Sequence, residues 1–180
     1  FNEISKVGIP IMIQDAPLSG IELTVPLLTK MLNEIEYLTC FKIESAQAAS
    51  KIRALIKNCH SKLDAPFDGE ESITLYADLE AGISGSMSSA LLPEKIAPVI
   101  EYFLNDQKEK AEETYNHILP IINFENRQCG FRGTKTVMKE GGVIKSDFCR
   151  HPIKPLDEDT KKLLFSFAKK YDLLTYKWGK

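Results

Sequence analysis

The chain has 180 residues, of which 43% are hydrophobic and 27% charged, and its formal net charge at pH 7 is −2. This balance predicts a single globular domain and gives no support for a nucleic acid or an anionic membrane as partner. No apolar run approaches the ~18 residues of a membrane span, and no signal peptide pattern opens the chain. Four scattered cysteines without a C-x-x-C pair indicate a reducing compartment, so we expect a cytoplasmic protein without a metal or other cofactor.

The first part of the chain alternates short apolar runs with helical patterns. An apolar run at residues 8–15 precedes a helical pattern at 23–35, and a second run at 38–43 precedes one at 46–59. Each run is continuously apolar rather than alternating, as expected of strands that are covered on both faces. The two repeats therefore predict two strand–helix units of a parallel sheet.

The same alternation continues and then gives way to helices. A run at 63–67 leads to a helical pattern at 73–81, and a run of small residues at 82–87 precedes a helical remainder. The helices expected after Pro93 cover residues 93–105, 107–124, 131–140 and 157–173. Four strand–helix units are half of a (β/α)₈ barrel, which typically takes roughly 250 residues. A doubly wound sheet is the competing architecture, although no Gly-rich phosphate loop supports its nucleotide-binding versions.

One lysine stands at the end of the second apolar run. Lys42 follows four residues that are mostly apolar, and Glu44 comes two residues later. Because an ammonium group is costly to remove from water, such a setting favours the neutral, nucleophilic amine that a Schiff-base enzyme needs. Glu44 projects to the same face of a strand and is placed to move protons beside that amine. A plain salt bridge between the two is the alternative interpretation.

Polar residues collect at the ends of all four runs. In a (β/α)₈ barrel the carboxyl ends of the strands hold the active site, so we expect these residues to line one mouth. The candidate substrate-binding residues are Gln14, Asp68, Gly69, Glu71, Ser84 and Ser86, with Asp15 also expected in the site. Alternatively, Glu70 and Glu71 begin the next helix, where its dipole favours acids, and the two serines satisfy a tight strand end.

Four segments resemble a known superfamily. They resemble parts of the carboxyl-terminal half of the dihydrodipicolinate synthase / N-acetylneuraminate lyase superfamily, whose members are Schiff-base (β/α)₈ barrels. The four segments are residues 10–17, 41–44, 67–71 and 82–93. The resemblance implies that residues 1–92 supply barrel strands five to eight with their helices. Residues 93–180 would supply the last barrel helix and a helical extension of the same domain. It also implies Lys42 as the catalytic nucleophile, Glu44 as the base, and a homo-oligomer, dimer or tetramer, in the full-length protein.

Within the superfamily the closer resemblance is to the 2-keto-3-deoxy-L-arabonate dehydratases. It rests on residues 13–17, 41–44, 69–71, 122–128, 141–144, 150–152 and 178–179. The lyases of the superfamily usually carry a tyrosine where Gln14 stands, and an amide does not titrate in the useful range. This departure favours dehydration over aldol cleavage. The resemblance implies a small-molecule 2-keto sugar acid as substrate, with 2,5-dioxopentanoate and water as products.

Three other functions stay open at this point. The first is an aldolase of the same superfamily that cleaves a 2-keto-3-deoxy acid to pyruvate and an aldehyde. The second is a relative that decarboxylates its substrate as it dehydrates it. The third is an inactive half barrel, since the chain opens at Phe1 without an initiator methionine. Such a half barrel would leave two unpaired sheet edges, which favour association with another copy.

Overall fold

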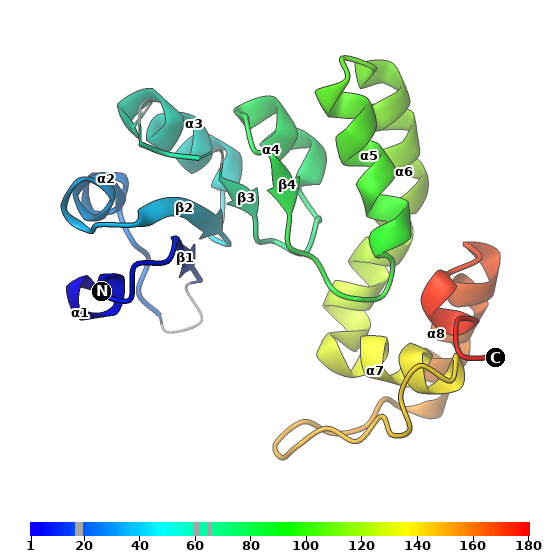
Figure 1. The fold of residues 1–180 in the computed structure, drawn as a ribbon. Coiled ribbons are helices and arrows are strands. Elements are labelled where there is room, and N and C mark those ends of the chain that lie inside the picture. Colours follow the sequence, from blue (N-terminus) through cyan, green and yellow to red (C-terminus); the bar gives the residue numbers. More distant parts are fainter. Residues whose placement is uncertain (17–19, 60–61, 65) are drawn as a thin grey trace. The chain divides into compact units, whose positions relative to one another are not determined.

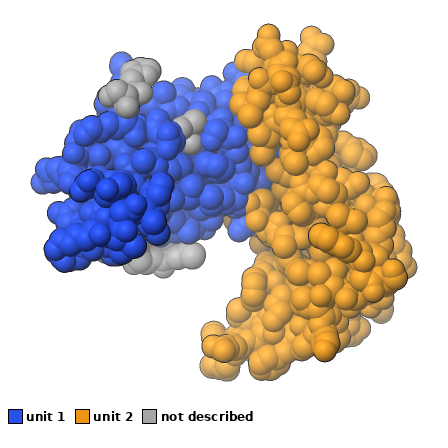
Figure 2. All heavy atoms as spheres, in the orientation of Figure 1, with its two compact units in different colours: residues 1–87 blue, residues 88–180 orange. Residues whose placement is uncertain are grey.

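The computed structural model describes residues 1–16, 20–59, 62–64 and 66–180 (Figure 1). The chain forms two compact units, residues 1–87 and residues 88–180 (Figure 2). This division falls slightly before residue 92, where the sequence placed the end of the barrel strands and their helices.

The first unit is built on a parallel sheet of four strands in the order β1-β2-β3-β4. The strands are β1 (Ile11–Asp15), β2 (Leu38–Ile43), β3 (Phe67–Asp68) and β4 (Gly85–Ser86). The helices of this unit are α1 (Asn2–Ser5), α2 (Val25–Glu34), α3 (Ala48–Cys59) and α4 (Leu75–Ala81). Figure 1 shows α2, α3 and α4 along one side of the strands. The predicted α/β organisation with a parallel sheet is confirmed.

Local sequence explains where the helices of this unit begin and what they bury. Thr24 caps α2 by accepting a hydrogen bond from the Leu27 N–H, and Pro26 stands in the first turn, where its fixed φ suits a helix. On α3, Ile52 and Leu55 are fully buried. This apolar stripe covers the sheet, and removing it from water is the main favourable contribution to folding.

The last two strands are shorter than the sequence predicted. β3 begins only at Phe67 because Pro66 before it has no N–H to donate to a neighbouring strand. β4 is limited to Gly85 and Ser86. A Cβ at Gly85 would lie 2.8 Å from Cε1 of Phe67, so this close strand pair requires glycine there.

The register of the strands determines to which face of the sheet each side chain at the strand ends projects. Gln14, Lys42, Phe67 and Gly85 are successive partners across the sheet, so their side chains project to one face, which we call the lysine face. Asp15, Ile43, Asp68 and Ser86 are partners one residue further and project to the opposite face. We call this the helix face because Lys51 of α3 contacts Asp15 there.

The second unit is helical, as predicted. It contains α5 (Pro93–Leu104), α6 (Lys108–Phe124), a π-helical turn (Glu125–Cys129), α7 (Phe131–Glu140), α8 (Glu158–Lys170) and a 3₁₀ turn (Leu174–Tyr176). α5 packs on α6, and α7 packs on α8. Asp157 caps α8 by accepting a hydrogen bond from the Thr160 N–H at 2.9 Å. Among the helices that the structure describes, none combines the length and the apolar character needed to cross a membrane.

Candidate active site

Lys42 and Glu44 meet on the lysine face at the end of β2. The Lys42 Nζ lies 3.2 Å from the Glu44 Oε2, and the two side chains are only 13% and 22% exposed. The prediction that both residues project to the same face is therefore confirmed. The contact joins a primary amine to a carboxylate that can take up or return a proton, and in the resting state it is also an ion pair.

Gln14 reaches the same carboxylate from the neighbouring strand. It is the register partner of Lys42, and its Nε2 donates a hydrogen bond to the Glu44 Oε2. One carboxylate oxygen thus accepts from both the amide and the amine. We call Gln14, Lys42 and Glu44 the Lys42 cluster. In the described part of the chain, no three His, Cys, Asp or Glu side chains are arranged to hold a metal ion.

Gly69 allows the backbone of the next strand to approach Glu44. Its N–H donates to the Ile43 carbonyl at 2.8 Å, and a Cβ at this position would lie 2.9 Å from the Glu44 Cβ. Real Cβ atoms do not tolerate that distance, so a side chain at 69 would displace either strand or the Glu44 side chain. Glycine at 69 is therefore part of what places Glu44.

This contact gives a first prediction. Gly69→Ala should reduce the turnover of the full-length protein at least about tenfold, because small displacements of a positioned catalytic group are costly. It should also lower the free energy of unfolding by about 1–3 kcal/mol through overpacking. Steady-state kinetics and urea unfolding measure the two effects. Wild-type turnover in Gly69→Ala would contradict the placement of Glu44 by this glycine.

Asp68 lies on the helix face, and the structure does not bring it to the Lys42 cluster. Its carboxylate is fully buried and accepts hydrogen bonds from the Ser86 Oγ at 2.7 Å, the Glu70 N–H at 2.9 Å and the Ser72 N–H at 3.0 Å. Burial raises the pKa of Asp68 above its ordinary value, while these hydrogen bonds oppose the shift. The geometry assigns Asp68 to holding the turn after β3, in contrast to the predicted substrate contact.

The two serine candidates of the fourth strand also lie apart from the cluster. Ser86 shares the helix face with Asp68, and its hydroxyl lies 2.7 Å from that of Ser72. Ser84 precedes β4, and its N–H donates to the Pro66 carbonyl, so it stands toward the amino end of the strand. Glu71 has a left-handed φ of 55° in the turn before α4, so it does not begin that helix.

Behind Asp68, a second buried carboxyl group predicts a pH dependence of stability. Asp78 on α4 accepts a hydrogen bond from the Thr74 hydroxyl at 2.7 Å, and burial, followed by the nearby charges of Asp68 and Glu70, raises its pKa to about 6. An aspartate in the unfolded chain has an ordinary pKa of 3.8. Between these values the folded state binds more protons than the unfolded state, so the free energy of unfolding should fall as pH rises toward 6.

Asp78→Asn should remove this component, which is about 3 kcal/mol in full because the pKa rises from 3.8 to about 6 and one pKa unit corresponds to about 1.4 kcal/mol. Urea unfolding of wild type and variant across the acidic range measures it. The free energy of unfolding of the variant, relative to that of wild type, should increase by about 2 kcal/mol between pH 4 and pH 7, the range in which most of this component is lost. An unchanged difference between the two proteins over this range would contradict the assignment to Asp78.

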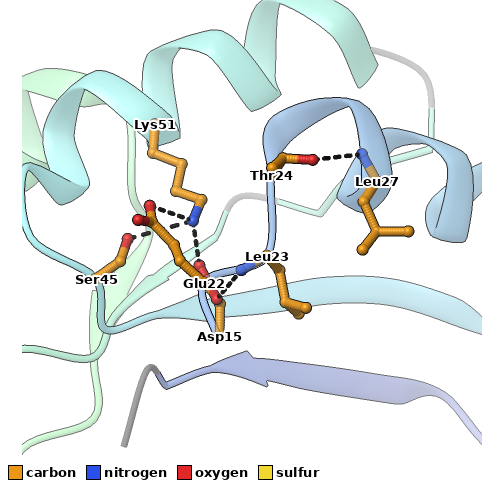
Figure 3. Close-up of polar contacts among 7 residues, drawn as sticks. All are labelled: Asp15, Glu22, Leu23, Thr24, Leu27, Ser45 and Lys51. Atoms are coloured by element: carbon orange, nitrogen blue, oxygen red, sulfur yellow. Dashed lines mark hydrogen bonds and ion pairs between the residues drawn. The ribbon is translucent and has the colours of Figure 1, made fainter. Parts of the chain in front are cut away.

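Sequence reasoning missed a cluster on the helix face, beside the ends of β1 and β2 (Figure 3). The Lys51 Nζ lies 2.5 Å from the Asp15 Oδ2, 3.0 Å from the Glu22 Oε1 and 3.4 Å from the Ser45 Oγ. Asp15 was expected in the site, but it projects away from Lys42. A signal was present: Lys51 stands on the buried stripe of α3, three residues after Ala48 and four before Leu55. A buried lysine requires a partner.

Comparison with known proteins decides the family. Residues 1–171 match the model of the Dihydrodipicolinate synthetase family. The chain belongs to this family. The resemblance that rested on short segments of the sequence is thereby confirmed over nearly the whole chain.

Two curated members of the family illustrate its range. The chain is 44% identical over 173 residues to the L-2-keto-3-deoxyarabonate dehydratase of Azospirillum brasilense. The aligned region covers 96% of this chain and 56% of that protein. It is 27% identical over 178 residues to the 4-hydroxy-tetrahydrodipicolinate synthase of Hydrogenobaculum sp., which covers 97% of this chain and 60% of that protein. The chain therefore spans little more than half the length of these relatives.

Solved structures of the family share the fold. The crystal structure of dihydrodipicolinate synthase from Aquifex aeolicus superposes with a TM-score of 0.86 at 19% identity, over 96% of this chain and 59% of that chain. A monomeric dihydrodipicolinate synthase variant gives a TM-score of 0.81 at 20% identity, over 91% of this chain and 55% of that chain. The homo-oligomer and the cytoplasmic location stay predictions.

Proposed function

We propose that the Lys42 cluster is the Schiff-base site of a dehydratase that acts on a 2-keto-3-deoxy sugar acid. The observation that carries this proposal is the hydrogen bond from the Gln14 amide to the carboxylate that contacts Lys42. The substrate is 2-keto-3-deoxy-L-arabonate, and the 44% identity to the Azospirillum brasilense enzyme supports that choice. The products are 2,5-dioxopentanoate and water.

The first step joins the substrate to the enzyme. Lys42 passes a proton to Glu44, and its neutral Nζ attacks the C2 carbonyl; Glu44 then returns the proton to the carbinolamine oxygen, which leaves as water to give an iminium ion. The iminium withdraws electrons and thereby acidifies the protons on C3. Because the Glu44 Oε2 is 3.2 Å from the Lys42 Nζ, the carboxylate stands beside the carbon chain that is attached to that nitrogen.

The second step removes water from the sugar acid. Glu44 takes a proton from C3 and forms an enamine, and the enamine expels the C4 hydroxyl, which leaves as water with the proton that Glu44 returns. Transfer of a proton from C5 to C3 then gives the enol of a C5 aldehyde. The enol gains a proton on C4 and loses one from its oxygen to give the C5 aldehyde. Hydrolysis of the iminium regenerates the Lys42 amine and releases 2,5-dioxopentanoate, so one water is lost overall.

Gln14 distinguishes this chemistry from aldol cleavage. Cleavage between C3 and C4 needs a base at the C4 hydroxyl, and an amide does not accept that proton in the useful range. Instead, the Gln14 amide donates to Glu44 and orients the carboxylate toward the substrate chain. An aldolase remains the second candidate, because the chain is also 27% identical to a synthase of the family.

We further propose that β1 to β4 act as half of an eight-stranded barrel, the fold that the superfamily resemblance implies. The coverage of the family structures, 55–59% of each chain, supports this proposal. Four further strands would then complete the mouth around Lys42 and supply the contacts to the substrate carboxylate. Without them we expect no turnover, which is the inactive half-barrel alternative.

Product analysis tests the proposed reaction. Full-length protein is incubated with 2-keto-3-deoxy-L-arabonate, and the products are followed by ¹H NMR. We expect 2,5-dioxopentanoate without pyruvate. Equal amounts of pyruvate and glycolaldehyde would instead establish the aldolase and contradict the dehydratase. Retention of the substrate in the presence of folded full-length protein would contradict both.

A further inference from the structure

A buried ion pair stands on the opposite face of the sheet from the Lys42 cluster, and the proposed mechanism does not use it. The Asp15 side chain is 0% exposed and that of Lys51 is 7% exposed, with 2.5 Å between Oδ2 and Nζ (Figure 3). Removing two charges from water is costly, and geometry must compensate for it. The pair is firmly held, since the Asp15 Oδ1 also accepts from the Leu23 N–H at 3.1 Å.

Two contacts of Lys51 fall on chain neighbours of residues in the Lys42 cluster, whereas a further contact, Glu22 at 3.0 Å, is an exposed carboxylate. Asp15 follows Gln14 on β1, and Ser45 follows Glu44 after β2. The Lys51 Nζ binds the Asp15 carboxylate and also donates to the Ser45 hydroxyl at 3.4 Å. One ammonium group therefore ties together the ends of the two strands that carry the Lys42 cluster.

The backbone completes this connection. The Glu44 N–H donates to the Asp15 carbonyl at 3.0 Å, so the residue that Lys51 holds by its side chain also holds Glu44 by its main chain. Because side chains alternate between faces, fixing Asp15 and Ser45 on the helix face sets where Gln14 and Glu44 emerge on the lysine face. A shift of either strand end would lengthen the Gln14–Glu44 hydrogen bond.

We propose that Lys51 is a positioning residue that holds the Glu44 carboxylate beside Gln14 and Lys42 from the helix face. This inference rests on the proposed function, since it assigns Lys51 to the step in which Glu44 moves the C3 proton. Lys42 lies inside β2, whereas Glu44 follows its last residue. Loss of Lys51 therefore affects the proton transfer by Glu44 more than the formation of the iminium on Lys42.

A purely structural ion pair has a different consequence. Its loss would lower stability, and every step of the reaction would decline together with the folded fraction. The discriminating quantity is thus the rate of C3 proton removal for each iminium that forms. Pyruvate supplies both readouts, because its iminium can be trapped by borohydride and its C3 protons exchange with D₂O when a base removes them.

The test uses the full-length protein and three variants. Asp15→Asn/Lys51→Met removes both charges, which avoids leaving one buried ion without its partner. Ser45→Ala removes one contact of the Lys51 ammonium and keeps the ion pair. Lys30→Met is the matched control, because Lys30 is 66% exposed and pairs only distantly, at 3.9 Å, with Glu34 on the same helix. Circular dichroism establishes the folded fraction of each.

For the double variant we expect a borohydride adduct with pyruvate within about twofold of wild type, and C3 exchange for each adduct reduced at least about tenfold. With 2-keto-3-deoxy-L-arabonate, kcat should fall at least about tenfold while KM changes less than about threefold. Ser45→Ala should exchange about threefold more slowly than wild type, since it loses one hydrogen bond. Lys30→Met should match wild type.

Wild-type exchange for each adduct in the folded double variant would overturn the role of Lys51. If the double variant does not fold, Ser45→Ala decides, and a wild-type exchange rate in that variant likewise overturns it. A failure of the proposed function would give a different result, because wild-type protein would then form no borohydride adduct with pyruvate.

Discussion

Lys42→Ala is expected to lower kcat/KM for 2-keto-3-deoxy-L-arabonate by about 10⁴-fold or more, because it removes the amine that we propose to bond to C2. The Lys42 Nζ is the amine beside Glu44 on the lysine face, and it is nearly buried. Steady-state assays of 2,5-dioxopentanoate formation with folded full-length protein measure the loss. Among the lysines of this unit, we propose Lys42 alone as the nucleophile.

The control for this prediction is Lys30→Ala. It removes a lysine on α2 whose Nζ lies 3.9 Å from the Glu34 Oε1 in an exposed ion pair. Because such pairs contribute little, kcat/KM should stay at the wild-type value. Turnover in Lys42→Ala within about tenfold of wild type would contradict a covalent role, since losing a nucleophile costs far more than that.

Glu44→Gln separates proton transfer from the formation of the Schiff base. The amide keeps the shape of the side chain but accepts no proton, so kcat should fall about 10²–10⁴-fold, as for removal of a general base. The iminium should still form on Lys42. Quenched reactions with the keto acid, together with C3 exchange of pyruvate in D₂O, measure the two steps separately.

Glu34→Gln serves as the matched control, because Glu34 is 62% exposed and lies at the end of α2. It should leave both steps unchanged. Rapid C3 exchange in Glu44→Gln would remove Glu44 from its assigned role and direct attention to another base.

The periodicity of the sequence is sufficient to predict the contact between Lys42 and Glu44. Residues two apart in a strand share a face, which places these two side chains together. The structure confirms the contact at 3.2 Å. Gln14 joins them because β1 pairs in parallel with β2 in a register that sets Gln14 beside Lys42.

Register also explains the candidates that the sequence misplaced. β3 and β4 are two residues long, so no alternation along them could reveal which face Asp68 or Ser86 would occupy. Both project with Asp15 to the helix face. Gly69, one residue beyond Asp68, falls beside Glu44 instead.

The ion pair between Lys51 and Asp15 escaped prediction because it joins residues that are far apart in the sequence. Lys51 and Asp15 are 36 residues apart, and no local pattern couples a residue on the buried stripe of a helix to a strand end that distant. Helix boundaries followed local signals more closely. α7 has the bounds that the sequence predicted, whereas α4 begins two residues late, since Thr74 has a φ of −110° and a ψ of 13°, outside the helical region.

The proposed reaction depends on a covalent bond between Lys42 and a 2-keto acid. Full-length protein is treated with pyruvate and sodium borohydride and digested, and the modified peptide is identified by mass mapping. We expect one reduced adduct, located on Lys42 and absent from Lys42→Ala. An adduct located on Lys51 or another lysine, or no adduct in folded protein, would contradict it.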